Sequence, residues 1–80
     1  MKKTFILASA SWCTPCQQLK QRLLATGLLD RVTIKDADEF PTFFKDHNIN
    51  AVPRLVVYSD NGEVQDIISG VEEIFAAIKK

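Results

Sequence analysis

The sequence is short, has no long apolar run and has no excess of charge of one sign, and each of these properties excludes a class of protein. Its 80 residues suffice for one small domain, and a chain of this size buries about 60–65% of the surface that it exposes when unfolded. It lacks an apolar run near the roughly 20 residues that span a bilayer. Ten basic and ten acidic residues cancel, whereas nucleic acids and anionic membranes select for clustered Lys and Arg. We therefore expect a single domain over residues 1–80, monomeric, with neither nucleic acid nor membrane as a partner.

Cysteine is also scarce, with two in the whole chain, Cys13 and Cys16. A secreted mini-protein held together by disulfides needs more cysteines at wider spacing. A bridge between two cysteines three positions apart closes almost no loop, so it constrains the unfolded chain only slightly. We therefore interpret the two cysteines as a reactive pair and not as a structural crosslink.

The first ten residues superficially resemble a secretory signal, with two lysines, an apolar run and the small residues Ala8-Ser9-Ala10. A signal has an apolar core of about 7–15 residues, whereas the segment from Thr4 to Ala8 supplies five. Cleavage after Ala10 would also leave the cysteine pair at the new terminus. We therefore interpret the segment as part of the fold and expect a cytoplasmic protein.

Hydrophobic periodicity predicts the order strand, helix, strand, helix, strand, strand, helix. Leu24 is placed on the apolar face of the first helix, Asp38 is expected to cap the second, and Gly27 to end the first. Strands that alternate with helices indicate a sheet with helices packed on its faces. The predicted strands span residues 3–8, 31–35, 55–58 and 63–68, and the predicted helices span residues 14–26, 39–47 and 71–79.

The motif Trp12-Cys13-Thr14-Pro15-Cys16 lies between the first strand and the first helix. Unpaired amides and the positive end of the helix dipole stabilise a thiolate at a helix N-terminus. Cys13 is therefore the predicted nucleophile. Cys16 lies one turn further on and is predicted to be more buried, so that it resolves a mixed disulfide by attacking Cys13. Pro15 is expected to stiffen the turn between them.

Other interpretations of these residues stay open. Two cysteines are half of a zinc site, although structural zinc usually takes four ligands and His47 is the only histidine. The cysteines are alternatively inert members of the core. His47 is a candidate general base, but its place beside several phenylalanines favours a structural role.

The motif resembles the thioredoxin/glutaredoxin superfamily, and within it the thioredoxin version of the motif. The resemblance covers nearly the whole chain and implies that the Val52-Pro53 bond is cis, beside the sulfurs, with the Val52 backbone pairing with substrate. Ser69-Gly70 resembles the end of the last thioredoxin strand, where Gly70 would leave room for a partner's backbone. The chain length resembles short archaeal and phage proteins of this kind.

The resemblance implies an α/β fold of the minimal thioredoxin type, βαβαββα. Its four-stranded mixed sheet has the order 2-1-3-4 with helices on both faces, and the last two strands are expected to run antiparallel to the first two.

Three positions depart from the family pattern. Leu7 stands where thioredoxins carry a buried Asp that helps move a proton at the inner cysteine, and Ser9 and Ser11 are weaker candidates for that role. Thr14 replaces a glycine and is expected to stiffen the turn. Arg54 follows the proline, where a small or apolar residue is expected; we expect it to point to solvent, with acidic partners or a lowered thiol pKa as the alternative.

The predicted activity is thiol–disulfide oxidoreduction, in which the Cys13–Cys16 pair reduces protein disulfides without a further cofactor. By resemblance, thioredoxin reductase or glutathione recharges the pair, and ribonucleotide reductase is a plausible client. The alternatives are a glutathione-dependent glutaredoxin, with charges near Asp66 or Lys35 holding glutathione, and a non-catalytic binding module. The predicted docking surface consists of Trp12, Thr14, Pro15, Val52, Pro53 and Gly70.

Overall fold

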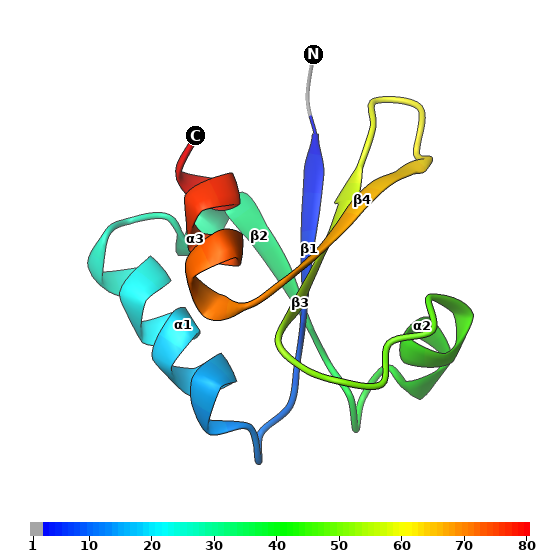
Figure 1. Ribbon diagram of the computed structural model, residues 1–80, viewed down its shortest axis with the longest axis horizontal. Helices are drawn as coiled ribbons and strands as arrows, with labels where there is room; N and C mark the ends of the chain where they lie inside the picture. The colour runs from blue at the N-terminus through cyan, green and yellow to red at the C-terminus, as the bar shows by residue number, and fades with distance from the viewer. Residues whose placement is uncertain (1–2) are drawn as a thin grey trace.

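A four-stranded mixed sheet carries helices on both faces in the computed structural model, which describes residues 3–80 (Figure 1). The strands are β1 (Thr4–Ser9), β2 (Val32–Asp36), β3 (Arg54–Tyr58) and β4 (Val64–Ser69). The helices are α1 (Thr14–Ala25), α2 (Pro41–Asp46) and α3 (Val71–Lys79). Met1 and Lys2, with which the signal-like segment begins, lie outside the described residues.

The order of the strands is β2-β1-β3-β4, which confirms the predicted fold class. β1 pairs with β2 in parallel and with β3 in antiparallel orientation. β4 is antiparallel to β3, so it runs parallel to β1. The expectation that both of the last strands oppose the first two was therefore wrong for β4, because the tight turn after β3 reverses the chain once more.

The pleat of β1 divides its side chains between two cores. Leu7 faces α1 and α3, while Ala8 packs with Val56 and Ile49 on the side of α2. Figure 1 shows α1 and α3 on one side of the sheet and α2 on the other. The buried members of the larger core are Leu7, Leu19, Leu23, Leu55, Val57, Ile74 and Ile78.

β3 is buried on both faces, as its continuous apolar run predicts. Leu55 and Val56 are 0% exposed and Val57 is 5% exposed. β4 lies at the edge of the sheet, and most of its residues are exposed. The prediction of a central strand followed by an edge strand is confirmed.

Two local predictions were wrong. Leu24 is 67% exposed, because the buried stripe of α1 is narrow and already filled by Cys16, Leu19 and Leu23. Asp38 does not cap α2: its N–H donates to Oδ1 of Asp36, and the position before the helix is Phe40, which has no capping side chain. A short 3₁₀ helix, Leu29–Arg31, was not predicted from the sequence.

His47 is a structural residue at the end of α2. Its Nδ1 donates to the carbonyl oxygen of Phe43 at 2.9 Å, and its Nε2 lies 2.7 Å from the Tyr58 hydroxyl oxygen. Tyr58 pairs with Thr4, at the opposite end of β1 from its junction with the cysteine motif. The catalytic-base interpretation of His47 therefore has no support in the geometry.

Leu19→Ala should lower the free energy of unfolding by about 2–5 kcal/mol, because Leu19 is fully buried in the larger core. Leu24→Ala, which removes the same atoms from an exposed site on the same helix, should change it by less than about 0.5 kcal/mol. Urea unfolding followed by circular dichroism measures both. Equal losses in the two variants would contradict the packing described here.

Candidate active site

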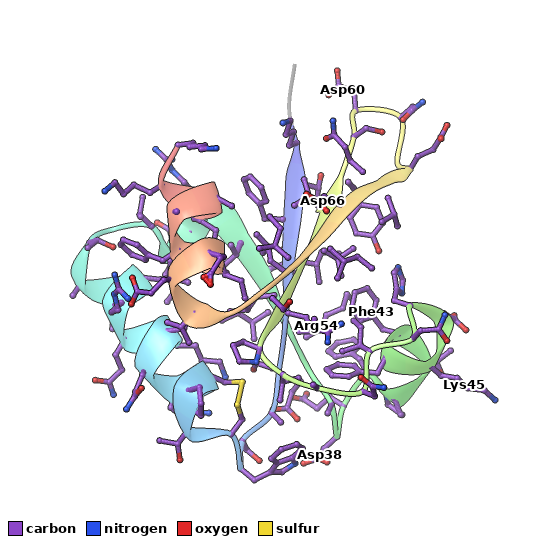
Figure 2. All side chains as sticks on the ribbon, viewed as in Figure 1. Asp38, Phe43, Lys45, Arg54, Asp60 and Asp66 are labelled. Carbon is purple, nitrogen blue, oxygen red and sulfur yellow. A yellow bond between two sulfur atoms is a disulfide. The ribbon has the colours of Figure 1, made fainter. Side chains whose placement is uncertain are left out.

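Cys13 and Cys16 form a disulfide where β1 leads into α1, and their Cα atoms are 5.2 Å apart. Figure 2 shows the sulfur–sulfur bond at the first turn of α1, facing the segment that enters β3. Two hydrogen bonds to the carbonyl oxygen of Ala10 hold the loop before the helix: the Cys13 N–H donates at 3.1 Å and Nε2 of Gln17 at 3.2 Å. The first sulfur is thus fixed at the helix N-terminus, as the motif predicts.

The surroundings of the Cys13 sulfur favour negative charge. Cys13 is the N-cap residue of α1, and the backbone N–H of Cys16 donates to its Sγ at 3.2 Å. The first turn of α1 has no acidic residue. An N–H aimed at sulfur and the positive end of the helix dipole both stabilise a thiolate over a thiol.

The two sulfurs differ in access. Cys13 is 6% exposed, whereas Cys16 is 0% exposed, which confirms the predicted order of burial. They form one buried cluster with Ala10, and Ala37 packs against this cluster; the two alanines follow β1 and β2 directly. Neither alanine was singled out from the sequence, because a small residue at a loop carries no signal until the fold places it against the sulfurs.

Val52 approaches the outer sulfur from a segment distant in sequence. Its carbonyl oxygen lies 3.7 Å from Sγ of Cys13, and the Val52-Pro53 peptide bond is cis, as the resemblance implied. Because a disulfide sulfur has no proton to donate, this is a van der Waals contact in the oxidised form. Pro53 is buried beneath it.

An apolar pocket of about 210 Å³ adjoins this contact. Trp12 forms one wall and is 70% exposed, although it is the largest side chain of the motif. The other lining residues are Ala37, Phe44, Ile49, Asn50, Ala51 and Val52. The pocket therefore joins the exposed tryptophan to the backbone that touches the outer sulfur.

The remaining docking candidates lie around the same end of the sheet. Thr14 and Pro15 are exposed on the first turn of α1. Gly70 follows Ser69, which pairs with Arg54 directly after Pro53. Its φ of +93° favours glycine, and a Cβ there would lie 2.6 Å from a carboxylate oxygen of Glu73, so local conformation alone accounts for glycine at this position.

Three charged residues that were predicted near the cysteines do not form a common site beside them. Arg54 is half-buried rather than fully exposed, and Figure 2 shows it on the side of the sheet that carries Phe43. Asp66 pairs with Val57, toward the far end of β3, and Nζ of Lys35 lies 4.1 Å from the centre of the Phe40 ring. The structure thus does not gather Asp66 and Lys35 into a site for glutathione.

Among residues 3–80, the structure brings together no group of three or more His, Cys, Asp or Glu side chains of the kind that holds a metal ion. No helix in this part of the chain has the length and apolarity to cross a membrane.

Comparison with known proteins agrees with this geometry. The Thioredoxin family matches residues 1–80. Thioredoxin H2 of Arabidopsis thaliana is 32% identical over 68 residues, covering 81% of this chain and 51% of that protein. Thioredoxin H5 of Oryza sativa subsp. japonica is 31% identical over 75 residues, covering 89% of this chain and 56% of that protein. The chain therefore spans about half the length of these curated relatives.

The fold is likewise shared with solved structures. Oxidised mitochondrial thioredoxin 3 of Saccharomyces cerevisiae superposes with a TM-score of 0.77 at 28% identity, covering 96% of this chain and 76% of that one. The family matches the full sequence. The structure adds a disulfide at the start of α1, a cis proline beside it and the sheet order 2-1-3-4. The chain belongs to the thioredoxin family.

Proposed function

We propose that this protein is a thiol–disulfide oxidoreductase that reduces disulfides in other proteins through Cys13 and Cys16. The observation that carries the proposal is a closed Cys13–Cys16 disulfide at a helix N-terminus, with the outer sulfur accepting an N–H bond and the inner sulfur fully buried. This arrangement provides one sulfur that is easily ionised and a second that is held within reach of it.

The reaction proceeds in two exchanges. The Cys13 thiolate attacks one sulfur of the client disulfide, and the other client sulfur leaves as a thiolate that takes a proton from solvent. Cys16 then loses its proton to solvent and attacks Sγ of Cys13 as a thiolate, and the second client sulfur leaves as a thiolate that takes up a proton. Two electrons pass to the client, and the protein ends as the disulfide seen in this structure.

Trp12 and the adjoining pocket are the proposed docking surface for the client, together with Thr14, Pro15, Val52, Pro53 and Gly70. An exposed tryptophan beside an apolar hollow is typical of a binding surface. The pocket is lined by Val52, whose carbonyl oxygen lies 3.7 Å from Sγ of Cys13. A client segment seated there would bring its disulfide to the outer sulfur.

Trp12→Ala should weaken the docking of protein clients and leave the sulfur chemistry intact. We expect kcat/KM for insulin to fall roughly tenfold, equivalent to about 1.4 kcal/mol of lost binding. The rate with a small aromatic disulfide should change by less than about twofold. Parallel loss with both substrates would show instead that Trp12 supports the cysteines themselves.

Insulin reduction by dithiothreitol tests the proposed activity. The wild-type chain should accelerate the appearance of turbidity, and a variant with both cysteines replaced by serine should match the blank. Turbidity that develops equally with and without the wild-type protein would favour a non-catalytic binding module.

Thioredoxin reductase is the proposed electron donor, because the residues suggested for glutathione binding do not converge at the site. NADPH with thioredoxin reductase should recharge the Cys13–Cys16 disulfide. NADPH with glutathione and glutathione reductase should do so at least about tenfold more slowly, a difference of about 1.4 kcal/mol in activation free energy. The reverse order would assign the protein to the glutaredoxin type. The reductive direction fits a reducing compartment such as the cytoplasm.

A further inference from the structure

Ser9 is the last residue of β1 and is 0% exposed. Its Oγ is the one buried side-chain nitrogen or oxygen among residues 3–80 that has no hydrogen-bond partner. Buried hydroxyls in folded proteins are nearly always paired, because desolvating an unpaired polar group is unfavourable. The oxidised protein therefore holds a hydroxyl that lacks a partner.

The fold places this hydroxyl on the side of the inner cysteine. Alternation along β1 puts Ser9 on the same face as Leu7, which packs with Leu19 of α1. β1 runs toward the start of α1, and α1 runs back along the sheet (Figure 1). Ser9 lies two residues beyond Leu7 toward the start of α1, and Cys16 lies about one turn before Leu19 toward the same end. Ser9 should therefore face Cys16, as Leu7 faces Leu19. The next residue, Ala10, belongs to the same buried cluster as the two cysteines.

We propose that Ser9 is a positioning residue whose hydroxyl pairs with the Cys16 sulfur in the dithiol form and thereby favours reduction; this rests on the proposed redox function. In the disulfide, the Cys16 sulfur has no proton and is a weak acceptor. Reduction breaks the sulfur–sulfur bond, the two sulfurs separate to van der Waals distance, and Cys16 becomes a thiol that donates or a thiolate that accepts. Oγ of Ser9 then gains the partner that it lacks in the oxidised state.

The equilibrium with glutathione tests this inference. Two glutathione thiols reduce one Cys13–Cys16 disulfide and yield one glutathione disulfide, and alkylation followed by mass spectrometry gives the dithiol fraction. Ser9→Ala should shift the equilibrium toward the protein disulfide about tenfold, which corresponds to a reduction potential lower by about 30 mV. Ser11→Ala, at an exposed loop position two residues away, should shift it by less than twofold. An unshifted or opposite equilibrium in Ser9→Ala would overturn the inference.

Unfolding of both redox forms separates this role from simple packing. Ser9→Ala should leave the disulfide form as stable as the wild type or more stable, since it removes an unpaired hydroxyl. The same change should lower the urea midpoint of the dithiol form. Equal losses in the two forms would overturn the inference. Because these measurements need no client, a chain that passes them and yet reduces no protein disulfide would refute the proposed function alone.

Discussion

Cys13→Ser should reduce the rate of insulin reduction at least about a hundredfold, to that of dithiothreitol alone. A serine hydroxyl stays protonated at neutral pH and does not attack a disulfide, whereas a thiolate does. The helix N-terminus and the Cys16 N–H favour a charged sulfur at this position. They have no thiolate to stabilise in the serine variant. Steady-state turbidity and loss of NADPH in the coupled assay measure the effect.

Two controls accompany this variant. Circular dichroism should show an unchanged fold, because Cys13 lies in a small cluster with Ala10 and Cys16 and is not a member of the larger core. Ser11→Ala, in the same loop, should retain the wild-type rate, because Ser11 is exposed whereas the inner cysteine that it was suggested to serve is fully buried. A Cys13→Ser protein that keeps more than about a tenth of the wild-type rate would mean that Cys16 serves as the nucleophile, which its complete burial does not predict.

Cys16→Ser should stop the reaction halfway and accumulate a mixed disulfide between Cys13 and the client. The first attack needs only the outer sulfur, while release of the client needs a second thiolate within reach of it. Turnover should fall at least about a hundredfold even as the first attack persists. A non-reducing gel should show one client per chain, and the band should disappear with dithiothreitol.

The matched control is Cys13→Ser, which should form no such adduct under the same conditions. A second measurement, turnover of Cys16→Ser in excess glutathione, could contradict the role of Cys16 in releasing the client. If Cys16→Ser turns over near the wild-type rate with glutathione present, glutathione itself resolves the mixed disulfide, and the protein works by a monothiol route without the inner cysteine.

Much of the fold could be predicted because its signals are local. The apolar run of β3, the helical spacing of α3 and the turn after Tyr58 each depend on a few neighbouring residues. The cysteine motif lies between a strand and a helix, and that position alone predicts the electrostatics of the outer sulfur. These predictions agree with the structure because propensity, pattern and packing favour the same answer.

The features that were missed depend on contacts between distant segments. Leu24 fits a helical face by spacing, yet it lies outside the narrow buried stripe of α1 and is 67% exposed. The pocket beside Trp12 takes its other wall from residues 44–52, and only the finished sheet brings them together. Ser9 attracted attention as a polar residue near the motif, but its unpaired hydroxyl became visible only once every neighbour was placed.

The proposed reaction depends on a Cys13 thiol whose pKa lies below the value of about 8.5 found for free cysteine. Alkylation of the reduced protein with iodoacetamide over a range of pH, with Cys13 followed by mass spectrometry, tests it most directly. We expect the midpoint of the Cys13 rate to lie below that of free cysteine, so that Cys13 reaches a larger fraction of its plateau rate at pH 7 than free cysteine does. A midpoint equal to or above that of free cysteine would contradict the proposed role of Cys13.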